Sequence, residues 1–439
     1  MQAPSHKPTI HILLALLCLV AFQIACNAPT RRETRSQLAE PTTVAAPVSR
    51  TTALDPSSPT PELTIPATAS ASPSLDSPTD SQLRLVAYYV AWNEKTRSYP
   101  VAAIPANKLT HLIYAFASIK DGVCTTADPE ADAANLPALN TLESSYPHLK
   151  ILISIGGQGH AALFSAAAVT VEGRQVLAAS CLDFMKINGF DGIDLDWEFP
   201  QPEERQNFTA LLADFRYKLD EAGKNDGSSY LLTVAAGASP YQYDDVDLGD
   251  IAPLVDWINL MSYNYHGKWS ALTGFNAPLF PSSGDLAASQ VERLTFNVHA
   301  AVQAFLERSV PKEKIVVGIP FFGRRWSGVA SENNGLYQTF DTQASQPESG
   351  ASVDYRDVVG SYLLDGSGFT RFWDEEAKVP WLYSAREQVM LSYDDPESIA
   401  AKSAYIRENG LGGAMIWQLG MDDAQGTLLT TLYNQLHEH

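Results

Sequence analysis

Residues 190–200 read Phe-Asp-Gly-Ile-Asp-Leu-Asp-Trp-Glu-Phe-Pro, and this stretch decides the fold class. Apolar residues alternate with acids over residues 193–198, which is the period of a β-strand and not of a helix. Because side chains alternate between the two faces of a strand, Asp194, Asp196 and Glu198 share one face and the apolar residues between them share the other. The stretch therefore predicts a buried strand with three acids on one face and Glu198 at its carboxyl end.

Short apolar runs recur along the chain with helical stretches between them. They are residues 85–90, 111–117, 150–155, 192–197, 231–236, 257–261, 315–319 and 413–417. Buried parallel strands that alternate with helices are typical of an α/β protein, and eight of them favour a closed (β/α)8 TIM barrel. The count of eight also draws on a family resemblance given below. In barrel enzymes the chemistry lies at the carboxyl ends of the strands, where Glu198 is expected.

The interval between the seventh and eighth runs is too long for one barrel helix. Residues 327–392 are rich in tyrosine, glycine and charged residues and lack one long helical period. We interpret them as a small α+β subdomain inserted in a catalytic domain of residues 83–439. A disordered loop is the alternative, but large aromatic side chains favour a packed unit. These are Tyr355, Tyr362, Phe369, Phe372, Trp373 and Trp381.

The first 82 residues predict export and a stalk. Residues 1–26 read as a signal peptide, with an apolar run over residues 12–22 that is too short to span a bilayer as a mature helix. Cys26 follows Ala25 and resembles the lipid-modified cysteine of bacterial lipoproteins, so we expect a cell-surface lipoprotein, with a free secreted enzyme as the alternative. Residues 27–82 form a linker, since Pro, Ser and Thr fill 23 of the 40 positions 41–80 and cannot build a core.

Charge and cysteine content limit the classes of partner and fold. The chain has 50 Asp and Glu against 30 Lys and Arg, a net charge of -20, which disfavours nucleic acid and anionic membranes and suits a neutral substrate. Cys124 and Cys181 are the cysteines of the body of the chain. We expect two buried free thiols and no disulfide, because Cys181 lies in an apparent helix over residues 177–187.

The three acids predict acid–base chemistry. Like charges crowded inside a barrel cannot all ionise at low cost, so at least one proton is retained near neutral pH and Glu198 can remain an acid. A calcium site is the first alternative, but the glycine and distal glutamate of a calcium loop are missing. A solvated strand end is the second, and the apolar residues between the acids argue against it. We expect no metal and no cofactor.

The stretch at residues 190–200 closely resembles the signature of family 18 glycoside hydrolases, the chitinases and their relatives. Other segments resemble further strands of that family in the same order. They are residues 88–92 (Tyr-Tyr-Val-Ala-Trp), 110–117 (Thr-His-Leu-Ile-Tyr-Ala-Phe-Ala), 154–157 (Ser-Ile-Gly-Gly), 261–267 (Met-Ser-Tyr-Asn-Tyr-His-Gly), 318–324 (Gly-Ile-Pro-Phe-Phe-Gly-Arg) and 412–417 (Gly-Gly-Ala-Met-Ile-Trp). The resemblance runs from residue 83 to about residue 433 and includes the inserted subdomain.

The resemblance implies a retaining mechanism in which the substrate's own 2-acetamido oxygen attacks the anomeric carbon, an exception to the two-carboxylate scheme. Glu198 is then the general acid and later the base. Asp196 holds the acetamido N–H, Asp194 modulates the charge of Asp196, and Tyr263 orients the acetamido oxygen.

The resemblance also implies a sugar-binding site around these residues. Trp417 forms its floor, Tyr88, Phe116 and Arg324 its wall, and Asp191 and Ser154 support the strand ends. Gly156, Gly157, Met261 and Asn264 complete the set. Phe116 and Met261 lie in apolar strands, so a purely structural role is the alternative for both.

Three residues depart from the pattern of the family. Asn264 stands where many chitinases have Asp, so it raises the pKa of the acid less and predicts a more acidic pH optimum. Gln158 replaces a Trp that often stacks a sugar on the leaving-group side, and Phe322 replaces a frequent Tyr. Both put the binding of long polymer on that side in doubt.

These features predict a chitinase that hydrolyses β-1,4-linked N-acetylglucosamine in chitin or chito-oligosaccharides, acting as a monomer. Endo and exo action stay open. A family 18 enzyme for peptidoglycan or the N-glycan core is one alternative, and the inserted subdomain favours linear chitin over it by analogy alone. A chitin-binding lectin is another, but such lectins usually lose the terminal acid, which Glu198 retains.

Overall fold

The computed structural model describes residues 83–287, 289–342 and 351–437. By internal contacts the chain divides into two units, Met1–Leu75 and Asp76–His439, and every described residue belongs to the second unit. The expected signal peptide, the linker and Cys26 lie outside the described residues. Among the described residues, no helix is both long and apolar enough to cross a membrane.

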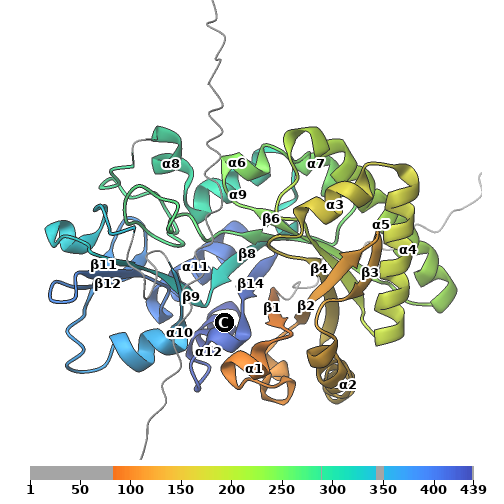
Figure 1. Cartoon of the computed structure of the whole chain (residues 1–439), viewed down its shortest axis with the longest axis horizontal. Helices are drawn as coiled ribbons and strands as arrows, with labels where there is room; N and C mark the ends of the chain where they lie inside the picture. Colours follow the sequence, from red (N-terminus) through yellow and green to blue (C-terminus); the bar gives the residue numbers. More distant parts are fainter. Residues whose placement is uncertain (1–82, 288, 343–350, 438–439) are drawn as a thin grey trace, which may run out of the picture. The chain divides into compact units, whose positions relative to one another are not determined.

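Eight parallel strands of the described chain close into a barrel (Figure 1). Each strand pairs with the next around the ring, and β1 closes it by pairing with both β14 and β2. The fold class predicted from the sequence is therefore confirmed, and the predicted runs match the strands to within three residues at either end. The strands are β1 (Arg84–Val90), β2 (His111–Lys120), β4 (Lys150–Gly156), β5 (Gly192–Asp196), β6 (Leu231–Gly237), β7 (Trp257–Met261), β8 (Ile315–Pro320) and β14 (Gly413–Trp417).

Helices cover the outside of the barrel. The longer ones are α2 (Pro129–Ser145), α4 (Val171–Asn188), α5 (Arg205–Asp226), α9 (Val298–Glu307), α11 (Pro396–Asn409) and α12 (Thr427–His437). The shorter ones are α1 (Asn93–Arg97), α3 (Ala161–Ala168), α6 (Pro240–Tyr243), α7 (Leu248–Ile251) and α8 (Gln290–Thr295). A further short helix, α10 (Tyr355–Asp357), lies in the insertion between the seventh and eighth barrel strands. Local signals set their ends. For example, the Asp395 side chain accepts from the N–H groups of Glu397 and Ser398 at the start of α11, and Gly410 ends that helix with a φ of 62°.

A second, antiparallel sheet lies between β8 and β14, on the left of Figure 1. Its strand order is β10 (Ala351–Asp354), β9 (Phe322–Ser327), β13 (Val389–Ser392), β12 (Val379–Ser384) and β11 (Thr370–Asp374). Trp326, Tyr383 and Met390 are buried in a hydrophobic cluster of its own. The sheet begins at Phe322, before the expected start of the insertion at residue 327, because β9 continues directly from the seventh barrel strand.

A short hairpin strand and the two body cysteines differ from expectation. Strand β3 (Val123–Thr126) pairs with the end of β2 and has no counterpart among the predicted runs. Cys124 on β3 and Cys181 on α4 are both free, as expected. Cys181 is buried, but the expectation for Cys124 was wrong, because β3 lies at the edge of the sheet and leaves Cys124 half-buried.

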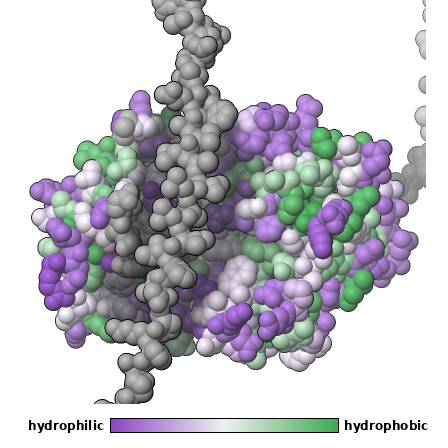
Figure 2. Space-filling view, viewed as in Figure 1, coloured by the Kyte–Doolittle hydropathy of each residue, from purple (hydrophilic) through white to green (hydrophobic). Residues whose placement is uncertain are grey.

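Hydrophobic side chains on the surface gather on the right of Figure 2, over α3, α4 and α5. The exposed apolar residues there include Leu163, Val169, Val171 and Val176. The remainder of the visible surface alternates between polar and apolar side chains, as is usual for a folded domain.

Candidate active site

Strand β5 places two acids inside the barrel. Asp194 and Asp196 are 0% and 2% exposed, while Ile193, Leu195 and Trp197 are fully buried. The Trp197 ring stacks on Phe164 of α3 with ring centres 5.3 Å apart, on the outside of the barrel. The alternation predicted from the sequence is therefore present, with the acids inward and the apolar residues outward.

Asp194 lies at the centre of a buried hydrogen-bond network. Its carboxylate accepts from the hydroxyls of Tyr88 (2.8 Å), Ser154 (2.8 Å) and Thr233 (2.6 Å) and from Nδ2 of Asn259 (3.2 Å). Burial raises the pKa of Asp194, and these hydrogen bonds oppose the rise by stabilising the charged form. The network fixes this carboxylate in one orientation.

Asp196 is buried with an unsatisfied oxygen. Its Oδ1 has no hydrogen-bond partner among the described residues. Burial raises the pKa of Asp196 well above its usual value, and the charges of Glu198 and Asp194 raise it further. A buried oxygen without a partner is costly in a folded protein, so this atom is suited to accept a hydrogen bond from a bound ligand.

Glu198 is the second residue after β5, at the carboxyl end of the strand. Burial raises its pKa from the usual 4.5 to about 7. A carboxyl with such a pKa is protonated at mildly acidic pH and on about half of the molecules at pH 7, so it is available as a general acid.

Tyr263 lies just beyond the end of β7, close to all three acids. Its pKa is raised well above 10 by burial first and then by the charges of Asp196, Glu198 and Asp194. Gly318 of β8 makes room for the ring, because a Cβ at that position would lie 2.9 Å from Cε1 of Tyr263. The neutral hydroxyl is therefore available as a hydrogen-bond donor beside the acids.

An aromatic cluster covers the carboxyl ends of β1, β2 and β14. The ring centres of Tyr88 and Trp417 are 5.2 Å apart, and those of Phe116 and Trp417 are 6.0 Å apart in a stacked arrangement. Trp92 packs on Phe116 at 6.4 Å. Phe116 and Trp417 are only partly buried, so they present aromatic surface to a ligand.

Two glycines at the end of β4 allow this close packing. Gly156 has a φ of 110°, and a Cβ there would lie 2.4 Å from the carbonyl oxygen of Asp196. Gly157 has a φ of 85°, and a Cβ there would lie 2.7 Å from Cζ of Phe116. Any other residue at either position would displace the acid strand or the aromatic cluster.

Asn264, which lines the same cavity as Glu198, forms a hydrogen-bonded pair with Arg324. Asn264 is exposed, with a φ of 64°, and its Oδ1 accepts from Nη2 (2.7 Å) and Nε (3.2 Å) of Arg324. Arg324 also lies over the ring of Trp269 at 5.2 Å. The contacts of Arg324 thus include Asn264 and Trp269, and its predicted place in the wall with Tyr88 and Phe116 stays a prediction.

Asp191 does not belong to the site. It precedes β5 at the amino end of the strand, where its Oδ2 accepts from the N–H of Ile151 (2.8 Å) and its Oδ1 pairs with Lys150 (2.7 Å). It joins β4 to β5 at the opposite end from Glu198, so it stabilises the barrel. Ser154, which was also predicted to support the strand ends, donates a hydrogen bond from its hydroxyl to Asp194.

A cavity of about 890 Å³ opens beside Glu198. Its lining includes Glu198, Met261, Tyr263 and Asn264, but not the aromatic cluster of Tyr88, Phe116 and Trp417. Further lining residues are Gln158, Tyr241, His266, Trp269 and Phe296. The cavity therefore extends from the acids toward the exposed rings of Tyr241 and Trp269, away from the cluster.

Several of these residues were missed from the sequence. Thr233 pairs with Asp194 in the β5–β6 ladder, so the register of two inward-facing strands would have found it. Asn259 is a single polar residue in the apolar strand β7, which is a usable signal for a buried hydrogen-bond partner. Tyr241 lies in the short helix α6 and Trp269 in a loop, and a single large aromatic residue in either setting predicts no particular site.

Comparisons with known proteins agree with this geometry. The model of the family "Glycosyl hydrolases family 18" matches residues 84–422. Chitinase A1 of Niallia circulans is 39% identical over 77% of this chain, and the chain spans 56% of the length of that protein. Among solved structures, a chitinase of Bacillus thuringiensis is 34% identical with a TM-score of 0.76, over 81% of this chain and 70% of the other. A family 18 N-acetylglucosaminidase of Paenibacillus barengoltzii is 35% identical with a TM-score of 0.70, over 80% and 99% of the two chains.

Proposed function

The chain belongs to glycosyl hydrolase family 18, and from this premise we propose that it is a chitinase that hydrolyses β-1,4 bonds between N-acetylglucosamine residues. The observation that carries the proposal is Glu198, a carboxyl with a pKa of about 7 beside a large cavity and two further acids. A protonated carboxyl at that place is suited to protonate a glycosidic oxygen. The chitinases among its relatives favour chitin as the substrate.

In the first step, the acetamido oxygen of the substrate attacks the anomeric carbon while the bond to the leaving oxygen breaks. Glu198 gives its proton to that oxygen, and the sugar is left as a cyclic oxazolinium ion. In the second step, water attacks the anomeric carbon, Glu198 takes a proton from the water, and the acetamido group is released. Two inversions retain the β configuration, and no residue of the enzyme is bonded to the sugar.

Asp196 and Tyr263 position the acetamido group. Oδ1 of Asp196, which lacks a partner among the described residues, accepts the acetamido N–H and stabilises the positive charge of the oxazolinium ion. The hydroxyl of Tyr263 donates to the acetamido oxygen and directs it at the anomeric carbon. Four hydrogen-bond donors fix Asp194, whose negative charge lies near Asp196. That charge strengthens the hydrogen bond that Asp196 accepts from the acetamido N–H.

The aromatic cluster binds the sugar that reacts, and the cavity binds the sugars of the leaving group. Trp417 stacks under the sugar that reacts, and Tyr88 and Phe116 complete that side. The leaving-group sugars occupy the cavity, where Gln158 supplies an amide in place of an aromatic ring and Trp269 and Tyr241 offer stacking surfaces. This arrangement supports binding of chito-oligosaccharides on both sides of Glu198.

The location and assembly of the protein are also proposals. The apolar run over residues 12–22 and Cys26 support export and a lipid anchor at the cell surface, with the linker holding the catalytic domain away from the membrane. We propose that the protein acts as a monomer, because the acids, Tyr263 and the aromatic cluster all come from one barrel.

Product analysis on three substrates tests the proposed function. The described domain, from residue 83 onward, is incubated with chitohexaose, with peptidoglycan and with a glycoprotein that carries N-glycans, and the products are identified by mass. We expect short chito-oligosaccharides from chitohexaose and no products from the other two. Cleavage of peptidoglycan or glycoprotein without cleavage of chitohexaose would overturn the proposal. A lectin would bind chitohexaose and leave it intact.

A further inference from the structure

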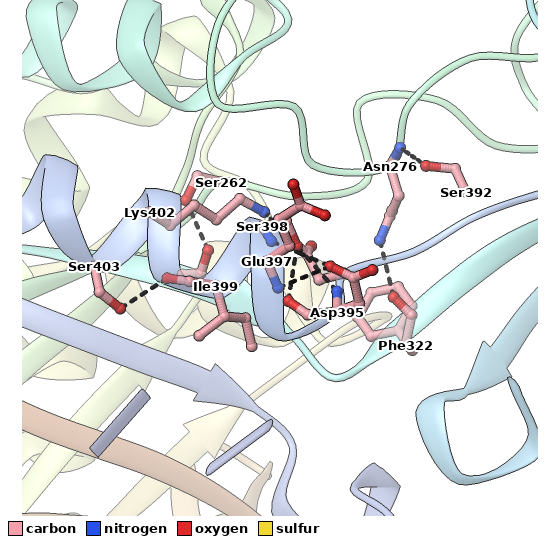
Figure 3. Close-up of polar contacts among 12 residues, drawn as sticks. Ser262, Asn276, Phe322, Ser392, Asp395, Glu397, Ser398, Ile399, Lys402 and Ser403 are labelled. Carbon is pink, nitrogen blue, oxygen red and sulfur yellow. Dashed lines mark hydrogen bonds and ion pairs between the residues drawn. The ribbon is translucent and has the colours of Figure 1, made fainter. Parts of the chain in front are cut away.

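Asn276 is a fully buried asparagine in the segment between β7 and α8. Its backbone N–H donates to Oγ of Ser392 (2.8 Å), and its backbone carbonyl accepts from the N–H of Tyr265 (3.1 Å). Its side chain donates from Nδ2 to the carbonyl of Phe322 (3.1 Å) and accepts at Oδ1 from the N–H of Asn264 (3.2 Å). Figure 3 shows Asn276 between Ser392 and Phe322.

The partners of Asn276 come from three separate segments. Tyr265 and Asn264 belong to the loop after β7, Phe322 begins β9, and Ser392 ends β13. One residue therefore joins the rim of the barrel to two neighbouring strands of the inserted sheet. Because the amide is buried, losing these bonds would leave the backbone groups of Asn264 and Phe322 without partners in the interior.

Two of the residues that Asn276 binds, Phe322 and Ser392, are neighbours of Arg324 in the inserted sheet. Ser392 is the residue paired with Arg324 in the β13–β9 ladder, and Phe322 lies two residues before it on β9. Asn276 thus binds both strands of the pair that carries Arg324. Its side-chain Oδ1 also accepts from the backbone N–H of Asn264. The side chain of Asn264 in turn accepts from Arg324. Asn264 and Trp269 line the cavity, and Arg324 contacts both, donating to the Asn264 side chain and lying over the ring of Trp269 at 5.2 Å.

We propose that Asn276 is a positioning residue that sets the wall for the leaving-group sugar, by fixing Asn264 and Arg324 relative to each other and to Trp269. This inference rests on the proposed function, since it takes the cavity as the place of the leaving-group sugars. The backbone N–H of Tyr263 donates to the carbonyl of Met261 (2.8 Å) and not to Asn276, while the Tyr263 ring packs edge-on against that of Phe322 with centres 5.8 Å apart. Asn276 makes no hydrogen bond to Tyr263 or the acids, so we expect it to affect the use of leaving-group sugars more than the chemistry at the anomeric carbon.

Two substrates separate these roles. Chitohexaose places sugars on both sides of the scissile bond, whereas 4-methylumbelliferyl chitobioside has a small aryl leaving group in place of the leaving-group sugars. We expect Asn276→Ala to lower kcat/KM for chitohexaose by about 10- to 100-fold, and to lower it for the aryl substrate by much less. The ratio of the two kcat/KM values is the readout, because a loss of folded protein lowers both equally.

Asn135→Ala is the matched control. Asn135 is also a buried asparagine that donates to a backbone carbonyl, that of Ala91 (2.9 Å), but it lies on α2 and does not line the cavity. We expect a comparable loss of stability and an unchanged ratio. Asn276→Asp keeps the acceptor for Asn264 and loses the donor to Phe322, so it should lower the ratio by an intermediate amount.

Ser392→Ala keeps the test decisive if Asn276→Ala does not fold. It removes only the acceptor of the backbone N–H of Asn276, and we expect a ratio lowered by about 2- to 5-fold. Ratios within twofold of wild type in every folded variant at positions 276 and 392 would overturn the positioning role. A wild-type enzyme that cleaves neither substrate would instead overturn the proposed function.

Discussion

Burial of Glu198 gives the acid its function and also makes the folded protein less stable at high pH. Its pKa of about 7 in the folded protein lies above the usual 4.5, so the folded state holds the proton more tightly than the unfolded state does. The free energy of unfolding therefore falls as pH rises from about 4.5 to about 7 and stays lower above that range.

Replacing Glu198 by Gln should remove this loss of stability at high pH. Glutamine is close in size and cannot ionise, so we expect Glu198→Gln to raise the free energy of unfolding by about 1–3 kcal/mol at pH 8, and to change it little at pH 5, where Glu198 is protonated. Thermal unfolding at the two pH values measures the difference. A variant that is less stable than wild type at pH 8 would show that ionised Glu198 does not destabilise the folded protein.

We expect the residue at position 264 to affect the upper pH limit of activity. A carboxylate at this position would disfavour ionisation of Glu198 and raise its pKa, so Asn264→Asp should shift the upper limb of the kcat/KM profile to higher pH, by about 0.3–1 pH unit. The shift should be modest because Arg324 donates twice to this side chain and would pair with the new charge. Asn264→Ala serves as the uncharged control. An upper limb that does not move in Asn264→Asp would contradict this role.

The residues of the site differ in how far the sequence could predict them. The acids and Tyr263 lie in or next to strands with a clear period, so their faces follow from alternation and the family resemblance. Thr233, Asn259 and Asn276 act through partners on other strands. Asn276 contacts residues 46 and 116 positions away, at Phe322 and Ser392, and such contacts depend on packing that no local pattern records.

At the scale of elements, a buried ion pair fixes the return from the inserted sheet to the barrel. Lys402 of α11 and Asp394, just after β13, are 0% and 1% exposed in their side chains and 2.5 Å apart. Ser398 also donates to Asp394 (2.7 Å), in the cluster drawn in Figure 3. The pair anchors the first turns of α11 at the point where the chain re-enters the barrel.

Removing one partner of this pair should be costly. Lys402→Met leaves the Asp394 carboxylate buried without its cation, and we expect a loss of about 3–5 kcal/mol in the free energy of unfolding, measured in urea. The double variant Lys402→Met with Asp394→Asn removes both charges and should recover part of that loss. A single variant within 1 kcal/mol of wild type, or a double variant that is worse than the single one, would count against the anchoring role.

The elements themselves were predicted unevenly, and the reason is their composition. Most barrel strands are largely apolar, and β5 shows a clear alternation of apolar residues with acids, so their runs were visible in the sequence. Strand β3, Val-Cys-Thr-Thr, is short and partly exposed, and strand β9 carries Arg324 and Arg325, so neither stands out as a buried run. The inserted sheet was found from its length and aromatic content, but its first strand was not.

On the scale of the whole molecule, the barrel and the inserted sheet meet at the site. β5 brings the acids, β1, β2 and β14 bring the aromatic cluster, and β9 brings Arg324 to Asn264 and Trp269, which line the cavity. The net charge of -20 suits a neutral polymer, which the proposed substrate is. The fold class followed from the apolar runs together with the family resemblance, which guided the count of eight, whereas the shape of the cavity depends on loops.

The rate of chitohexaose cleavage by Glu198→Gln, compared with wild type at pH 6, tests the central claim most directly. Thermal unfolding of the same samples confirms that the variant is folded. If Glu198 is the general acid, kcat should fall by at least about 100-fold while the variant remains as stable as wild type or more so. A folded Glu198→Gln variant that releases the same products at an undiminished rate would contradict the account.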